Sequence, residues 1–270
     1  MKYVFGHSDR ELQRLADQAV VIEPITRQLL VDAGISSGMR VLDVGTGRGD
    51  VAFLAAELVG EGGMVVGVDR APEAVGLARE RAEARLVQNV SFEEGDAAEL
   101  NFDAPFDALI GRYFLEFQPD PARTLSRLLA CVRPGAIVAF HEIDWTGFRS
   151  VPPVATWDRC CELILETIGA TGADTQVGAK LPSIFAAAGV PAPSMEMTVT
   201  IGAGANSHVA AQRMAGLVAT VLPSLEERGL VPRGELDPDS LAARVVDEAA
   251  ASASAIVGPS EVRAWSRFEL

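Results

Sequence analysis

The chain has 270 residues, 49% of them hydrophobic, and its formal net charge at neutral pH is −14. A hydrophobic content near one half is enough for a large core, so we expect a folded chain and not a disordered one. The acidic balance argues against nucleic-acid partners, which select basic surfaces, and no polybasic run is present to hold an anionic membrane surface.

The first 36 residues predict helical structure. Apolar residues recur near a 3.6-residue period over residues 9–33. Ser8 and Glu11 have the spacing of a capping box, and Pro24 predicts a break into two helices. We expect this segment to form an N-terminal helical cap.

Short apolar strands then alternate with helices. The predicted strands cover residues 39–44, 64–68, 90–93, 106–110 and 136–140. The predicted helices cover residues 50–59, 72–86 and 121–132, with a turn at 133–135. This alternation is typical of right-handed βαβ units, so we predict an α/β fold with a Rossmann-like, mostly parallel sheet and helices on both faces.

The second half of the chain is less regular. Helical patterns cover residues 154–168, 180–188, 207–228 and 239–254, and strand patterns cover 195–201 and 262–268. Because a strand follows the last helices, they are expected to form an insertion rather than a separate domain.

A glycine-rich turn follows the first predicted strand. Gly45, Gly47 and Gly49 stand at alternate positions of the segment DVGTGRGD. Glycine lets the backbone turn tightly and approach a ligand without a Cβ clash, and the helix that follows presents free N–H groups. A structural turn has the same composition, so the flanking acids decide between the two interpretations.

Three acids lie at or just beyond strand ends and narrow the choice of ligand. Asp69 ends the second strand, 20 residues after Gly49, where a carboxylate can bind ribose hydroxyls. A dinucleotide would fit so far, but its fingerprint is GxGxxG, and here the glycines read GxGxG. Asp43 can pair with a cationic amino-acid group, and Asp96 stands where an adenine amino group could donate to it.

These segments together resemble the class I S-adenosylmethionine-dependent methyltransferases, particularly the bacterial small-molecule kind. The resemblance covers about residues 38–145 and includes the fourth strand with residues 106–112. It also includes the segment LLACVRPGAIVA, in which Ala136 replaces the second glycine of the family's turn. The resemblance implies a seven-stranded sheet with an antiparallel last strand and a helical insertion before it.

The resemblance also implies which residues bind the donor. Asp43, Gly45, Thr46 and Gly47 would hold its methionine part, although Thr46 stands where cysteine is frequent. The nucleoside side would be formed by the residues after the second, third and fourth strands: Asp69 at the ribose, Arg70 against the adenine, Asp96 and Ala97 at the adenine edge, and Gly111 and Arg112 lining the pocket.

Three polar residues follow the fifth strand and are the candidate catalytic groups. His141 can accept a proton near neutral pH, and Glu142 and Asp144 compete for the same role. An orienting or packing histidine is the alternative for His141.

The acceptor side is less defined. Tyr3, His7 and Arg14 could close over the pocket, or they belong to an ordinary surface helix. Tyr113, Phe114 and Trp145 could contact the acceptor, and Trp157 and Met214 could line an apolar pocket with Trp145. Core packing is the alternative for each of these five.

The predicted reaction is methyl transfer to a small molecule by in-line displacement, most simply to a hydroxyl oxygen. The enzyme would align the acceptor and exclude water, with S-adenosylhomocysteine as product and no metal. N- or C-methylation, a donor-binding protein without activity, another reaction in the same pocket and an NAD-dependent oxidoreductase remain alternatives.

We expect four parts along the chain. Residues 1–36 form the cap, 37–201 the donor-binding core with a helical insert at about 150–180, 202–260 a helical lid, and 261–270 the last strand. Three cysteines without a CxxC pair argue against disulfides and zinc. The expected absence of disulfides and the lack of a signal-like pattern in the first residues predict a cytoplasmic protein. An alanine-rich appendage could mediate a homodimer.

Overall fold

Residues 22–269 are described by a computed structural model, and they divide into two units. The sheet unit contains Ile22–Glu142, Val177–Glu196 and residues 262–269. The helical unit contains Ile143–Gln176 and Met197–Glu261.

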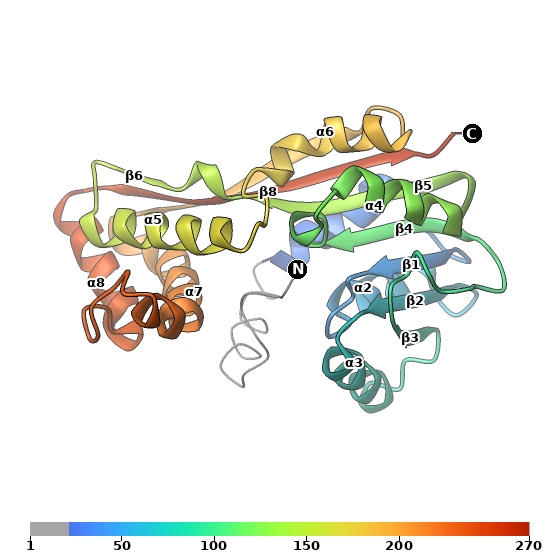
Figure 1. The fold of residues 1–270 in the computed structure, drawn as a ribbon, viewed down its shortest axis with the longest axis horizontal. Helices are drawn as coiled ribbons and strands as arrows, with labels where there is room; N and C mark the ends of the chain where they lie inside the picture. The colour runs from blue at the N-terminus through green and yellow to red at the C-terminus, as the bar shows by residue number, and fades with distance from the viewer. Residues whose placement is uncertain (1–21, 270) are drawn as a thin grey trace. The chain divides into compact units, whose positions relative to one another are not determined.

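The sheet unit is built on parallel strands in the order β3-β2-β1-β4-β5 (Figure 1). Their bounds are β1 Arg40–Val44, β2 Met64–Asp69, β3 Val90–Glu94, β4 Phe106–Arg112 and β5 Val132–Asp144. Strand β8, Ala255–Arg267, follows β5 in this order, and β7, Ser194–Ala203, pairs with β8.

The last strand runs antiparallel to β5, as the resemblance to class I methyltransferases implies. Gly135 donates its N–H to the carbonyl of Phe268 at 2.6 Å, and Phe268 donates to the carbonyl of Ala136 at 2.8 Å. These bonds join the start of β5 to the residue that follows the end of β8, so the two strands are antiparallel.

Alternating residues of the central strands fill two apolar clusters, one on each face. Leu42, Val44, Val66 and Val68 belong to one cluster, together with residues of α4, Pro121–Leu128, and α6, Val177–Ala188. Their neighbours Val41 and Val65 belong to the other cluster. That cluster is covered by the helical residues 22–33 and by two helices: α2, Asp50–Val59, and α3, Pro72–Ala84. The period of two in the strands therefore produces a sheet buried on both faces.

Two details of the sheet unit differ from the sequence prediction. The turn expected at 133–135 lies inside β5, because the strand register passes from Val132 opposite Phe106 to Ile137 opposite Ala108 and the residues between bulge out. Residues on both sides of Pro24 are helical. The rest of the predicted segment 9–33 lies outside the described residues.

The helical unit contains three packed helices and parts of three strands: β6, Arg149–Val151, the end of β7 and the start of β8. The helices are α5, Ala155–Ala170, α7, His208–Glu227, and α8, Pro238–Ala251, and Figure 1 shows them on one side of β6 and β8. Strand β6 pairs antiparallel with β8 through Ser150 opposite Ile256. The short helices η3, Trp145–Gly147, and η4, Gly204–Ser207, belong to the same unit. Strand β6 is absent from the sequence prediction.

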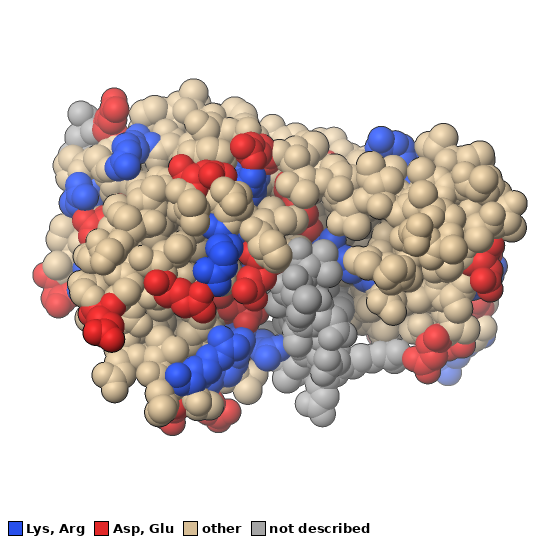
Figure 2. Space-filling model, turned by 180° about the vertical axis from the view of Figure 1, so that it is seen from behind, with Lys and Arg blue, Asp and Glu red and all other residues tan. Residues whose placement is uncertain are grey.

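Acidic and basic side chains are interspersed over the face of the sheet unit seen in Figure 2, and that face carries no extended basic patch. Within residues 22–269, no helix has the length and apolar character needed to span a membrane.

Candidate active site

The glycine-rich turn lies at the carboxyl ends of β1 and β2. Gly45, Gly47 and Gly49 have φ values of +67°, +54° and +83°, which side chains rarely adopt. A Cβ on Gly45 would lie 2.7 Å from Phe114 Cδ2, and one on Gly49 would lie 2.7 Å from Phe92 Cζ. A Cβ on Gly47 would meet nothing within 4 Å. Two of the glycines therefore allow close packing, and the third borders open space.

Asp43 places a buried carboxylate beneath this turn. One oxygen, Oδ2, accepts a hydrogen bond from Thr46 Oγ1 at 2.6 Å, and Oδ1 has no partner among the described residues. Burial raises the pKa of Asp43 to about 7, despite the hydrogen bond from Thr46. An unpaired buried oxygen of this kind suits a cationic ligand group, which would satisfy it and favour its ionised form.

Asp69 fixes the turn from the end of β2. Its Oδ2 accepts the N–H of Gly47 at 2.9 Å, and its Oδ1 accepts the N–H of Ala71 at 2.9 Å. A carboxylate oxygen can accept more than one hydrogen bond. Asp69 can therefore hold the turn and still accept hydrogen bonds from ligand hydroxyls.

Asp96 follows β3 and carries a positive neighbour. Its Oδ1 accepts the N–H of Ala98 at 3.0 Å, and its Oδ2 accepts from Arg70 at 2.6 Å. Burial raises its pKa, but the hydrogen bond from Ala98 and the charge of Arg70 outweigh burial, so the pKa lies below its usual value. Ala97 is buried in the core. Arg70 and Asp96 are thus paired at the edge where the sequence predicts the adenine.

Gly111 and Arg112 end β4 beside the turn. A Cβ on Gly111 would lie 2.8 Å from Phe140 Cε1, so its close packing requires glycine. Arg112 donates to Thr26 Oγ1 at 3.2 Å and lies 3.8 Å from Asp50. Sequence reasoning did not single out Thr26, which belongs to no local motif, and it assigned no role to Asp50, the last residue of the glycine-rich segment.

The three catalytic candidates have different surroundings. His141 is fully buried, and its Nδ1 lies 2.9 Å from Thr26 Oγ1. Asp144 accepts hydrogen bonds from the N–H and Oγ1 of Thr146 at 2.9 and 2.5 Å. His141 lies in the sheet unit and Asp144 in the helical unit.

Glu142 holds the turn after β4. Its Oε1 accepts the N–H groups of Phe114 and Leu115 at 3.0 and 2.8 Å, and Oε2 accepts that of Glu116 at 3.4 Å. These donors begin the short helix η1, Leu115–Phe117. Burial raises the pKa of Glu142 to about 7, although the three backbone hydrogen bonds lower it.

Tyr113 and Phe114 belong to the segment that Glu142 holds. Tyr113 has φ +52°, donates its N–H to the carbonyl of His141 at 2.9 Å, and places its ring 5.5 Å from the imidazole. The ring of Phe114 lies against Gly45. These residues are therefore beside the glycine-rich turn and His141.

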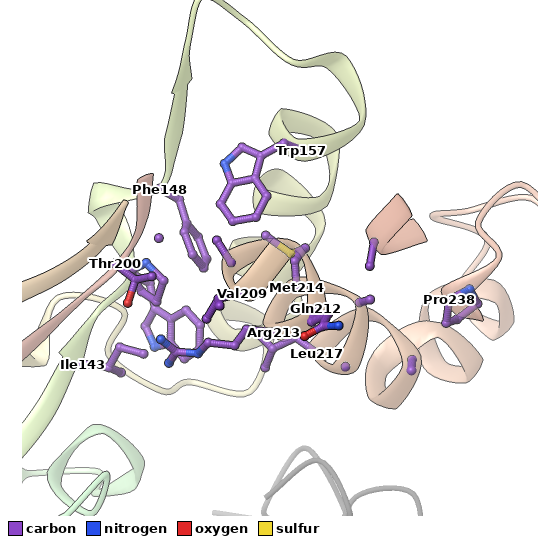
Figure 3. Close-up of a pocket in the computed structure, with 18 of the residues that line it drawn as sticks. Ile143, Phe148, Trp157, Thr200, Val209, Gln212, Arg213, Met214, Leu217 and Pro238 are labelled. Carbon is purple, nitrogen blue, oxygen red and sulfur yellow. The ribbon is translucent and has the colours of Figure 1, made fainter. Parts of the chain in front are cut away.

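The remaining acceptor candidates divide between the helical unit and the chain start. Trp145, Trp157 and Met214 line one cavity of about 760 Å³ in the helical unit (Figure 3). Tyr3, His7 and Arg14 lie outside the described residues. Over residues 22–269, no group of three or more His, Cys, Asp or Glu side chains could hold a metal ion.

A family model described as a methyltransferase domain matches residues 35–176, which is more than half of the chain. The chain belongs to this methyltransferase family. A protein from Bacillus halodurans C-125 has a solved structure that matches with a TM-score of 0.63 at 18% identity, covering 91% of this methyltransferase and 99% of that chain. At this identity, the match concerns the fold alone.

Two named relatives match the methyltransferase in sequence. Aklanonic acid methyltransferase from Streptomyces sp. strain C5 is 39% identical over 136 residues, which cover 49% of this chain and 62% of that protein. Nocamycin O-methyltransferase from Saccharothrix syringae is 36% identical over 135 residues, which cover 50% of this chain and 46% of that protein. The matched region spans less than two thirds of either relative.

Class I methyltransferases take their methyl group from S-adenosylmethionine, and the residues at the carboxyl edge of this sheet fit that donor. Asp43 offers a buried, unpaired carboxylate oxygen. The space beside Gly47 is open, and the carboxylates of Asp69 and Asp96 lie at the ends of the next two strands.

Proposed function

We propose that this methyltransferase transfers the methyl group of S-adenosylmethionine to a small molecule, most simply to a hydroxyl oxygen. The observation that carries the proposal is the unpaired, buried Oδ1 of Asp43 beneath a turn of three glycines. The two named relatives support a small-molecule acceptor, since one is named for aklanonic acid and the other for O-methylation of nocamycin.

The sheet unit supplies the groups that would hold the donor. Asp43 would accept a hydrogen bond from the ammonium group, and Asp69 would accept hydrogen bonds from the ribose hydroxyls. Asp96 and Ala97 would border the adenine, with Arg70 beside it. When bound, S-adenosylmethionine supplies a methyl group on a cationic sulfur whose departure leaves a neutral thioether. The chain itself must orient the acceptor and exclude water.

A hydroxyl acceptor must also lose a proton, and His141 is the group we assign to accept it. The carboxylates of Glu142 and Asp144 already accept backbone N–H groups. His141 lies beside Tyr113 at the carboxyl end of β5. An unprotonated amine acceptor would need positioning alone, which keeps N-methylation as the alternative.

The test is a methyl-transfer assay with methyl-labelled S-adenosylmethionine and a panel of neutral phenols, alcohols and amines. The proposal expects labelled product and an equal amount of S-adenosylhomocysteine, with hydroxyl acceptors preferred. Tight donor binding without transfer to any member of the panel would contradict it and favour a donor-binding protein.

A cytoplasmic location and a homodimer are proposals from the sequence alone. Light scattering coupled to gel filtration tests the homodimer, which predicts twice the mass of the 28.5 kDa chain.

A further inference from the structure

The helical unit contains a cavity of about 760 Å³ that is lined by its own residues. The lining comes from η3 and the segment after it, from α5, α7 and α8, and from β7 and β8. This volume is in the range of pockets that bind drug-sized molecules. The cavity shares no residue with the donor-binding edge of the sheet unit.

Three aromatic rings form a continuous wall of the cavity. Trp145 and Phe148 meet edge to face with centroids 5.7 Å apart, and Phe148 meets Trp157 in the same way at 5.9 Å. Met214, from α7, points toward the indole ring of Trp157 (Figure 3). Aromatic faces and a thioether favour a flat, ring-containing ligand.

Trp157 adds one buried polar group to this wall. Its side chain is 1% exposed, and its Nε1 is a buried donor for which the described residues supply no acceptor. Buried indole N–H groups usually find a partner, because leaving one unpaired costs free energy. A ligand oxygen beside Nε1 would satisfy it.

The charged residues that line the cavity are Arg213 and Asp239, and Arg213 is paired with a carboxylate. Arg213 lines the cavity and donates to Glu261 Oε1 at 2.8 Å, and the Glu261 side chain is 1% exposed. A buried carboxylate that lost this partner would be strongly destabilising. Arg213 is therefore held by Glu261, and an anionic ligand would have to compete for it.

We propose that the helical unit binds a neutral, planar, mostly apolar molecule that presents an oxygen to Trp157 Nε1. In calling this molecule the methyl acceptor, the inference rests on the proposed function. It narrows the acceptor to uncharged ring systems with a carbonyl or hydroxyl group. Binding itself requires no methyl donor.

Three ring compounds test the proposal by equilibrium dialysis without donor. The probes are 9-fluorenone, fluorene, which has the same ring system without the carbonyl, and 9-fluorenone-4-carboxylate, which adds a negative charge. We expect 9-fluorenone to bind about tenfold more tightly than fluorene, from one hydrogen bond. The carboxylate is expected to bind more weakly than 9-fluorenone. Equal or tighter binding of the carboxylate, or no saturable binding of 9-fluorenone, would overturn the proposal.

Trp157→Phe keeps an aromatic ring but removes the N–H donor together with the second ring of the indole. Both probes lose contact with the removed ring, but only 9-fluorenone also loses a hydrogen bond, so its binding should weaken about tenfold more than that of fluorene. Trp265→Phe, in the sheet unit, is the matched control and should change neither. Equal effects of the two variants would refute the role of Trp157.

A second variant protects the test against a folding defect. Ala242→Phe fills the cavity from α8 and should weaken 9-fluorenone and fluorene alike. Each variant is checked by S-adenosylmethionine titration, which reports the sheet unit. If Trp157→Phe weakens 9-fluorenone more than fluorene but no acceptor is methylated, the cavity is a binding site and the proposed function is wrong. If a neutral aromatic alcohol is methylated equally well by Trp157→Phe, the cavity assignment fails and the proposed function stands.

Discussion

Replacing Asp43 by asparagine tests whether its buried carboxylate binds the ammonium group of the donor. S-adenosylhomocysteine is the ligand of choice, because it carries the ammonium group without the sulfonium charge. With a pKa of about 7, Asp43 is about 1% ionised at pH 5 and about 50% ionised at pH 7. The ligand's ammonium stays protonated over this range.

If only the ionised carboxylate binds, the affinity for S-adenosylhomocysteine should rise about 50-fold from pH 5 to pH 7. Calorimetric titration measures it directly. In Asp43→Asn the affinity should be low at both pH values and nearly independent of pH. Glu142→Gln is the matched control, since the pKa of Glu142 is also raised to about 7. It should keep the wild-type pH dependence. A steep rise that persists in Asp43→Asn would refute the role of Asp43.

The same substitution has an opposite effect on folding without ligand. Because the folded-state pKa is raised from 3.8 to about 7, the folded chain holds a proton that the unfolded chain has lost. Its stability therefore falls as pH rises between these values. Asp43→Asn should match wild type near pH 4 and exceed it by on the order of 4 kcal/mol at pH 8 in urea unfolding. Equal stability at pH 8 would contradict the raised pKa.

Four substitutions separate binding, stability and chemistry. Gly47→Ala should weaken donor binding at least tenfold with a small loss of stability, about 1 kcal/mol, because its Cβ enters open space at a positive φ. Gly49→Ala should lower the melting temperature more, since its Cβ meets Phe92 at 2.7 Å; the reverse order would contradict the geometry of the turn. Burial raises the pKa of Glu142, so the melting temperature of wild type should fall as pH rises from about 4.5 to 7, and Glu142→Gln should make this fall smaller. If the melting temperature falls equally in Glu142→Gln, other groups cause its pH dependence. His141→Gln should lower kcat for a hydroxyl acceptor about 100-fold or more while donor affinity stays the same. An unchanged kcat would leave His141 as a packing residue.

Much of the sheet unit follows from local sequence patterns. Helix α2 has the predicted bounds, and β2 extends the predicted strand by one residue, to Asp69. Such elements are predictable because apolar periodicity and flanking glycines are encoded within a few residues. Strand β6 has three residues, too few to show an alternation, and it depends on pairing with β8. The bulge in β5 is likewise fixed by its neighbour β4.

The candidate site divides in the same way. Asp43, the glycines and Asp69 lie in short motifs, so sequence reasoning proposed them, and their roles as ligand groups stay predictions. The contact of Thr26 with His141 joins residues 115 positions apart, and that of Glu142 with Leu115 joins residues 27 apart. No local pattern reports such pairs. The cavity of the helical unit also combines separate segments, which is why Trp145 and Trp157 remained ambiguous in the sequence.

Titration of the wild-type chain with S-adenosylmethionine, and separately with NADH, tests the donor assignment most directly. Asp69→Asn and the exposed Glu73→Gln of α3 serve as test and control. The assignment predicts micromolar binding of S-adenosylmethionine by wild type and Glu73→Gln, at least tenfold weaker binding by Asp69→Asn, and no binding of NADH. Binding of NADH without binding of S-adenosylmethionine would contradict it and assign the glycine-rich turn to a dinucleotide.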